Sequence, residues 1–330
     1  MTSPALSRRH WKLALRFTLM LSFAAVAWTA NAQGKGQVPD VLRFGMSKSL
    51  FRDVNDNDAA AALSVYAKTY ADQYEMAVKM FILDGADAIT RAMQNDAFDM
   101  MALSTDEFLQ FAGKGLEGPL IMSVVNQSVT EVYLLLVRKD GAIKGLQDLR
   151  GRSLIVSSDL RAALAPIWLD VLSQQHGFDS PQQVFGKISF ASKPTQVVLP
   201  VFFGKSDACI VTRNAWDVMG ELNPQVKTQL RVIAESPPVV PGLGAFRRGI
   251  SPAFKEKLLR STEASNERLS FRQIMALFKT TGVREEPVSA LDSTRELVNA
   301  YEHLTIRGRR KTPNMARGSD WVSAVGRQNH

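Results

Sequence analysis

GADAITRAMQNDAFDMMALSTDEF, residues 85–108, places one short apolar strand between two helices. Residues 85–94 are expected to form a helix, residues 98–103 a buried strand, and Thr105 to about Ala112 a second helix. The apolar run stops at Ser104, and two acidic residues follow at once. A strand flanked by helices is the pattern of a parallel βαβ unit.

The alternation continues in both directions from this stretch. Before residue 112 we expect strands at 41–47, 75–83 and 98–103 and helices at 57–74, 85–94 and 105–112. LIMSVVNQ and EVYLLLVRKDG, between residues 120 and 141, then follow each other without a helix. Beyond them we expect a strand at SLIV, helices at 159–176, 195–203 and 213–222, and strands at 188–192, 208–211 and 230–235. ESPPVVPGLG, residues 235–244, breaks the pattern, and the remaining chain is expected to be mostly helical.

These elements predict an α/β protein of two lobes, each a mainly parallel sheet flanked by helices. Two extended crossings, near residues 128–140 and 235–241, would form a two-strand hinge. The expected limits are 33–131 with 237–304 for lobe 1 and 132–236 for lobe 2. Such a fold binds ligands in a cleft beyond the carboxyl ends of its strands and closes around them.

The first 32 residues have the layout of a secretory signal peptide. A basic segment that includes Arg8 and Arg9 precedes an apolar stretch from Phe17 to Ala30 and a small-residue cleavage site at Ala32. The alternative is an amino-terminal membrane anchor, but the apolar stretch is short for a membrane span. Export by the general or the twin-arginine route is left open, and a periplasmic location is expected.

The net charge of +8 comes from the two ends of the chain. The first 32 residues hold four basic residues and no acid, and residues 305–330 hold six basic residues and one acid. The part between them is close to neutral, so the charge does not indicate a nucleic-acid partner. Residues 305–330 are expected to be a solvated basic tail.

Few residues of the chain suit metal binding or catalysis. Cys209 is the only cysteine, which excludes an intrachain disulfide, and no cysteine near residue 32 is available for a lipid anchor. After residue 32 the histidines are His176, His303 and His330, and they lack metal-ligand spacing. Neither HExxH nor GxSxG occurs. We therefore expect no metal, no cofactor and no enzymatic activity, and a soluble monomer.

Several segments, in order, resemble the periplasmic binding proteins of phosphonate, phosphate and phosphite ABC transporters, which have the type 2 periplasmic-binding fold. The similar segments are LRFGMSKSL, DAITRAMQNDAFDMMALSTDEF, YLLLVRKDGAIKGLQDLRGRSLIVSS, VVLPVFFGKSDACIV and LRVIAESPPVV. The resemblance covers roughly residues 41–280. It implies capture of a small anionic or zwitterionic ligand and its delivery to an inner-membrane ABC permease. Two positions depart from the family pattern: Asp159 follows the serines of SSDLRAALAP, and KPTQ replaces a histidine–acid pair.

Ser104 and Thr105 are the first candidate ligand contacts. Ser104 with Glu107 three residues later fits a capping box, which by itself explains the serine. The same position, at the end of a strand and the start of a helix, also offers free N–H groups and a positive dipole end to an anion. Both interpretations remain open.

Other strand ends give further candidates. Ser47 and Ser49 follow the first strand, Ser157 and Ser158 follow SLIV, and Thr195 begins the helix after ISFASK. Each could be a helix cap instead. Because the carboxyl ends of parallel strands meet at one edge of a sheet, we expect these hydroxyls to converge on the cleft.

Three residues of the second lobe complete the predicted ligand set. Arg161 could clamp an anionic ligand or offset Asp159, and it could equally be an exposed helix arginine. Thr212 and Arg213 follow the strand DACIV, where a helix cap and a surface charge are the alternatives.

Two functional hypotheses from different classes follow. The first is a periplasmic solute-binding protein for a phosphonate- or phosphate-like oxyanion. The second is a periplasmic sensing module that reports a non-phosphonate ligand to a membrane sensor kinase. Permease genes beside this gene would support the first hypothesis, and a histidine-kinase gene the second.

Overall fold

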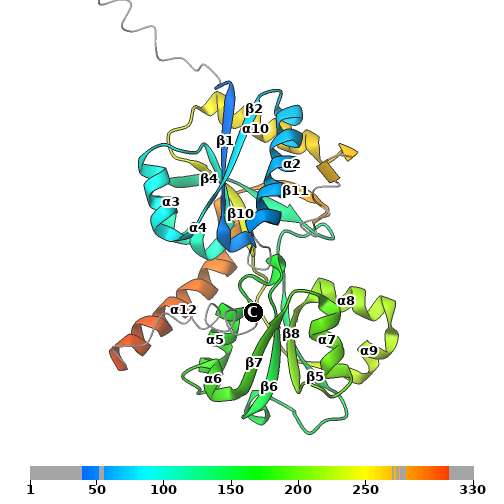
Figure 1. The fold of residues 1–330 in the computed structure, drawn as a ribbon. Helices are drawn as coiled ribbons and strands as arrows, with labels where there is room; N and C mark the ends of the chain where they lie inside the picture. The colour runs from blue at the N-terminus through cyan, green and yellow to red at the C-terminus, as the bar shows by residue number, and fades with distance from the viewer. Residues whose placement is uncertain (1–38, 52–55, 270, 273–274, 276–279, 312–330) are drawn as a thin grey trace, which may run out of the picture.

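The computed structural model describes residues 39–51, 56–269, 271–272, 275 and 280–311. Within them the chain forms two lobes, each built around one sheet (Figure 1). The expected signal peptide lies outside the described residues, and so does most of the expected basic tail. None of the helices in the described part has both the length and the apolarity needed to cross a membrane.

Lobe 1 contains a six-stranded sheet of order β11-β4-β10-β3-β1-β2. Its strands are β1 (Val41–Ser47), β2 (Ala77–Leu83), β3 (Met100–Ser104), β4 (Leu116–Val124), β10 (Gly242–Arg247) and β11 (Gly282–Glu286). The accompanying helical segments are η1 (Lys48–Phe51), α2 (Asp56–Tyr74), α3 (Gly85–Gln94), α4 (Thr105–Phe111), α10 (Pro252–Ser265) and η4 (Val288–Leu291).

Lobe 2 contains a five-stranded sheet of order β7-β6-β8-β5-β9. Its strands are β5 (Tyr133–Arg138), β6 (Arg152–Ser157), β7 (Phe185–Ala191), β8 (Ala208–Thr212) and β9 (Leu230–Glu235). Its helical segments are η2 (Leu146–Leu149), η3 (Leu160–Ala162), α5 (Ala165–Gln175), α6 (Pro181–Val184), α7 (Pro194–Phe202), α8 (Arg213–Leu222) and α9 (Pro224–Gln229).

Both sheets are mixed, which corrects the expectation of mainly parallel sheets. Strand β1 pairs in parallel with β2 and β3, and β6 pairs in parallel with β7 and β8. The remaining pairings are antiparallel. The difference arises from β5, which runs against both of its neighbours in lobe 2, and from β10 and β11, which run against β4 in lobe 1. The predicted α/β class and two-lobed fold are confirmed.

The predicted hinge corresponds to two crossings that lie side by side. The backbones of Glu131 and Val239 exchange N–H···O bonds of 2.7 and 2.8 Å. Two residues further along the first crossing, the N–H of Ser236 donates to the carbonyl of Tyr133 at 2.9 Å, and the N–H of Tyr133 donates to Ser236 Oγ at 2.8 Å. The antiparallel pairs β4–β10 and β5–β9 lie on either side of this point. The two crossings therefore run side by side where the chain passes between the sheets.

The last described helix, α12 (Asp292–Lys311), contacts both lobes. It begins near α4 of lobe 1 and packs along α5 of lobe 2 (Figure 1). Thr294 Oγ1 accepts a 2.9 Å bond from the N–H of Val240 in the second crossing. Leu297 is buried in the core of lobe 2. This helix thus ties the hinge to the second lobe.

The central strands carry a different core on each face, since successive side chains of a strand point to opposite sides. Tyr133 of β5 packs with Trp168 of α5, with ring centroids 6.3 Å apart. On the other face, Leu134 packs with Cys209 and Trp216. Both faces of the sheet in lobe 2 are therefore covered, as a sheet between two helix layers requires.

Candidate ligand site

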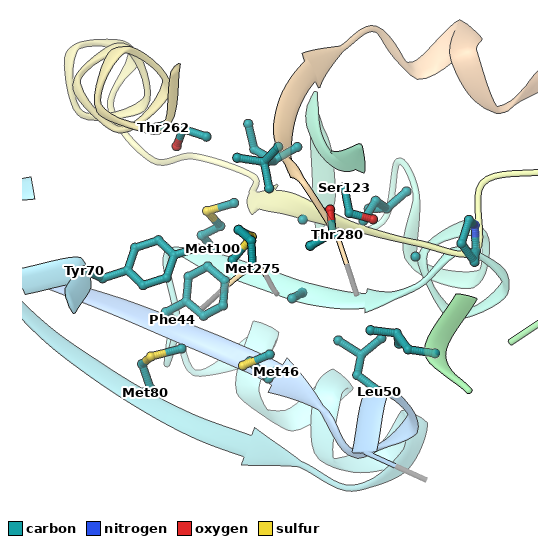
Figure 2. Close-up of a pocket in the computed structure, with 18 of the residues that line it drawn as sticks. Phe44, Met46, Leu50, Tyr70, Met80, Met100, Ser123, Thr262, Met275 and Thr280 are labelled. Carbon is teal, nitrogen blue, oxygen red and sulfur yellow. The ribbon is translucent and has the colours of Figure 1, made fainter. Parts of the chain in front are cut away.

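An apolar pocket of about 140 Å³ extends from lobe 1 to the edge of lobe 2 (Figure 2). Most of its lining is apolar and comes from β1, β2, β3, β4 and α2 of lobe 1: Phe44, Met46, Tyr70, Met80, Met100 and Ile121. The opposite lobe contributes Leu160 and Arg161 from η3. We call this space the apolar pocket. A ligand within it would contact residues of both lobes.

Alternation along the strands creates the apolar wall. Phe44 and Met46 point to the same face of β1, and Met100 and Ala102 point to that face from β3. The rings of Phe44 and Tyr70 stack with centroids 5.8 Å apart. Met side chains are flexible and polarisable, so this wall can adapt to ligands of different shape.

Arg161 is the basic residue among those lining the apolar pocket, and it is buried. Its Nε donates a 2.6 Å hydrogen bond to Glu131 Oε1 in the hinge, and its Nη1 donates a 2.7 Å bond to Ser123 Oγ in lobe 1. Its Nη2 lies 2.5 Å from the same Glu131 oxygen but makes no hydrogen bond of good geometry with the described residues. Arg161 therefore links the two lobes and keeps one buried donor unused.

Burial shapes the ionisation of the groups around Arg161. Burial raises the pKa of Glu131, and the attraction of Arg161 offsets only part of that rise. Burial likewise raises the pKa of Tyr133, whose hydroxyl donates to the carbonyl of Arg161 at 3.2 Å and accepts from the N–H of Leu164 at 3.3 Å. Tyr133 thus holds the backbone of the segment that carries Arg161.

In lobe 1 the predicted serines surround the carboxylate of Glu107. The hydroxyls of Ser47, Ser49 and Ser104 donate to it at 2.8, 2.7 and 3.0 Å. The backbone N–H of Ser104 adds a 3.2 Å bond, so the predicted capping box is present. Within the described residues no basic side chain lies within ion-pair distance of this carboxylate. The three hydroxyls of lobe 1 converge on one point, and their acceptor there is an acid of the chain itself.

Lobe 2 repeats this arrangement with a second acid. Ser157 Oγ donates to Asp159 at 2.8 Å, and the backbone N–H groups of Arg161 and Ala162 donate to the same carboxylate at 2.8 and 3.2 Å. Asp159 is buried. Ser158 is half-buried, and its backbone N–H donates to the carbonyl of Ala191 at 3.1 Å. A carboxylate thus occupies the strand end in each lobe where an oxyanion was expected.

The remaining candidates differ in their surroundings. Thr105 is fully buried beside the hinge, with its N–H bonded to the carbonyl of Pro241 and its Oγ1 without a hydrogen-bond partner among the described residues. Thr212 caps α8 by accepting from the N–H of Ala215 at 3.2 Å. Arg213 forms a 2.5 Å ion pair with Glu235 on the surface. Thr195 is exposed in the first turn of α7. Among these candidates, Arg161 is the one that lines the apolar pocket.

The sequence reasoning missed Glu131, Ser123 and the apolar wall. One signal for the wall was present, since Phe44, Met46, Met100 and Ala102 alternate on two of the predicted strands. Glu131 begins the run EVYLLLV, and an acid beside a buried strand indicates a paired charge. The sequence held no comparable signal that Ser123 would face Arg161 of the other lobe.

The model of the phosphonate-binding family, described as periplasmic substrate-binding proteins of phosphonate ABC transporters, matches residues 55–286. The chain belongs to this family. The family is one of transport proteins that bind substrates in the periplasm, so the predicted resemblance is confirmed. A comparison with curated proteins gave no match.

Solved structures agree on the fold. XAC2383 from Xanthomonas citri, solved with a chloride ion, is 18% identical with a TM-score of 0.57, over 81% of this chain and 99% of that chain. A binding protein component of an ABC phosphonate transporter from Pseudomonas aeruginosa is 16% identical with a TM-score of 0.54, over 87% and 95%. PhnD1 from Prochlorococcus marinus, solved with methylphosphonate, is 16% identical with a TM-score of 0.51, over 84% and 100%.

Proposed function

We propose that this periplasmic binding protein captures a small organic ligand in the apolar pocket by closing its two lobes. One observation carries the proposal: the pocket is lined by apolar residues of lobe 1 and by Leu160 and Arg161 of lobe 2. A ligand that contacts both lobes favours the closed arrangement by its difference in affinity for the two states. The proposed lobe limits are those expected from the sequence, with α12 shared between the lobes.

The anionic group of the ligand would lie at Arg161. The family supports a phosphonate-like ligand, as the sequence predicted. An oxyanion at the serines of either lobe would have to displace Glu107 or Asp159 from their hydroxyl and amide donors. The unused Nη2 donor of Arg161 offers a buried alternative, and hydrogen bonds to charged groups are stronger than neutral ones.

Delivery to an inner-membrane ABC permease follows from membership of the family. We propose export with cleavage after Ala32, action as a monomer, and no catalytic step. The test is uptake by the native host: deletion of the gene should abolish transport of the ligand, and restoration of the gene should recover it. Normal uptake together with a lost transcriptional response to the ligand would instead support the sensing role.

Closure of the two lobes can be measured separately from uptake. The radius of gyration of residues 33–330 in solution should fall when a saturating ligand is added. A ligand that binds tightly and leaves this radius unchanged would contradict capture by closure.

A further inference from the structure

The volume of the apolar pocket matches a small hydrocarbon group. Its volume is about 140 Å³. An engineered cavity of about 150 Å³ with a comparable apolar lining stays dry and binds benzene. A group of about six carbon atoms would therefore fill the pocket of this chain. Inorganic phosphate or a single methyl group would leave most of it empty.

The hydroxyl groups of the pocket are largely engaged within the protein. Thr262 Oγ1 donates to the carbonyl of Leu258 at 2.8 Å. Thr280 Oγ1 donates to backbone carbonyls at 2.7 and 2.9 Å. Ser123 Oγ accepts from Arg161. Phe44 and Tyr70 lie at one end of the pocket, and Ser123 and Thr280 lie toward the other (Figure 2). The end at Phe44 thus offers a ligand mostly carbon and sulfur contacts, and the hydroxyl of Tyr70 is a polar group of that end.

We infer that the apolar pocket takes a hydrocarbon substituent of the ligand, an alkyl or aryl group of about six carbons, with the polar head at Arg161 and Ser123. The inference rests on the proposed function, because it names the ligand class of the same site. It makes the substituent, rather than the oxyanion, the main determinant of affinity. Each methylene that leaves water for the pocket should tighten binding about fourfold.

The charges around the site support a ligand with an apolar substituent in the pocket and a compact polar head at Arg161. The charge of Arg161 is compensated by Glu131, and the carboxylates of Glu107 and Asp159 stand at the two strand ends. A small oxyanion with two negative charges would meet these acids and gain little apolar contact. A ligand with a long apolar group and a compact head gains the contact and places one polar group at the unused donor of Arg161.

Isothermal titration with methyl-, propyl-, hexyl- and decylphosphonate tests the inference on the mature chain. Affinity should rise about fourfold per methylene up to about six carbons and then level off. Hexanoate and hexanol test whether a carboxylate or a hydroxyl head group on the same six-carbon substituent also supports binding. Affinity that is equal across the series, or highest for methylphosphonate, would overturn the inference and leave the proposed function standing.

A pocket-filling variant and a matched control test whether the gain in affinity with substituent length arises in the apolar pocket. Ala102→Leu adds three carbons at a residue that lines the pocket, and Ala86→Leu adds the same atoms at an exposed position of α3. The gain from methyl- to hexylphosphonate should be lost in Ala102→Leu and kept in Ala86→Leu. If circular dichroism shows that both variants are folded, an equal gain in affinity from methyl- to hexylphosphonate in the two would contradict the assignment.

Benzene probes the pocket independently of any head group or transport. It should bind to the wild type and to Ala86→Leu, and should fail to bind to Ala102→Leu. Absence of binding by benzene and by every hexyl compound would overturn the inference. If the radius of gyration also stays unchanged with every phosphonate, the proposed function fails as well.

Discussion

The carboxylate of Glu107 accepts the hydrogen bonds at the start of α4 that a bound oxyanion would otherwise accept. Its carboxylate accepts from three serine hydroxyls and one backbone N–H at the start of α4. Negative charge at a helix amino terminus is favourable, so this arrangement is stable without a ligand. The hydroxyls that the sequence predicted as ligand contacts are bonded here to an acid of the protein, and their contact with a ligand stays a prediction.

Removal of that carboxylate should open the site to external oxyanions. In Glu107→Ala the hydroxyls of Ser47 and Ser104 lose their acceptor, and affinity for methylphosphonate should rise about tenfold to a hundredfold, since hydrogen bonds to charged groups are strong. Asp106→Ala, which removes an acid from the same helical turn, is the control. Calorimetry that finds equal methylphosphonate affinity in both variants would contradict this role.

Glu131 should give the stability of the fold a dependence on pH. Burial raises its pKa above the ordinary value of 4.5 despite the nearby Arg161. The unfolded chain therefore ionises first as pH rises, so the contribution of Glu131 is fully present below about pH 4.5 and declines as pH rises through the raised pKa. Glu131→Gln should lack this slope and should cost about 1 kcal/mol at low pH for a weakened hydrogen bond.

Urea denaturation of both proteins between pH 4 and pH 7 measures the effect. The difference in free energy of unfolding should narrow as pH increases. A difference that grows with pH would mean that the ion pair with Arg161 outweighs the cost of burial.

At the scale of elements, local patterns predicted most of the α/β framework. The helices at 85–94 and 213–222 and the strand at 230–235 have the predicted ends. The single helix expected at 159–176 is instead divided into η3 and α5. Asp159 caps the first turn, and a new helix begins at Ala165 with Pro166 in its first turn, so local capping overrides the apolar periodicity.

Strand β10 shows what the sequence could not reveal. GLGAFR follows a proline-rich segment and has two glycines, which locally indicate a loop. The structure inserts it between β3 and β4. A Cβ on Gly244 would lie 2.7 Å from Met100 Cε and 3.4 Å from Ile121 Cβ. The glycine leaves room for the side chains of Met100 and Ile121 inside the sheet, and this crowding exists only after long-range pairing.

Gly244→Ala should therefore destabilise lobe 1. The flexible end of the Met100 side chain would have to move, so the cost should be about 1 kcal/mol, the low end for overpacking. Gly141→Ala is the control, because its added Cβ would meet only ordinary contacts with Arg138 at 3.5 Å and beyond. Thermal denaturation should show a lower midpoint for Gly244→Ala alone. Equal midpoints would show that the sheet relaxes around the methyl group.

At the scale of the whole molecule, side-chain hydrogen bonds join the lobes outside the hinge backbone. Arg161 Nη1 donates to Ser123 Oγ at 2.7 Å, and Asn126 Nδ2 donates to Asn214 Oδ1 at 2.6 Å. Each bond contributes about 1 kcal/mol. Together they bias the lobes toward the arrangement in which they meet.

Loss of both bonds should shift the free protein toward a more open form. The double variant Ser123→Ala/Asn214→Ala should change the ratio of the two forms by up to about thirtyfold. Its radius of gyration without ligand should exceed that of the wild type. Thr228→Ala, which removes a bond local to lobe 2, should leave the radius unchanged. An unchanged radius in the double variant would mean that the hinge backbone and α12 alone fix the arrangement.

Because Trp168 and Trp216 both lie in lobe 2, tryptophan fluorescence is more sensitive to changes in that lobe than to changes in lobe 1. Both indoles lie in the cores of lobe 2, and the apolar pocket is lined by Phe44 and Tyr70 of lobe 1. With Trp321 replaced by phenylalanine, indole emission of the mature chain would come from the second lobe alone. A ligand that fills lobe 1 without moving the lobes would leave this emission nearly constant, while closure over Leu160 and Arg161 would alter it. Intrinsic fluorescence would therefore report closure, and calorimetry on the same sample would report occupancy.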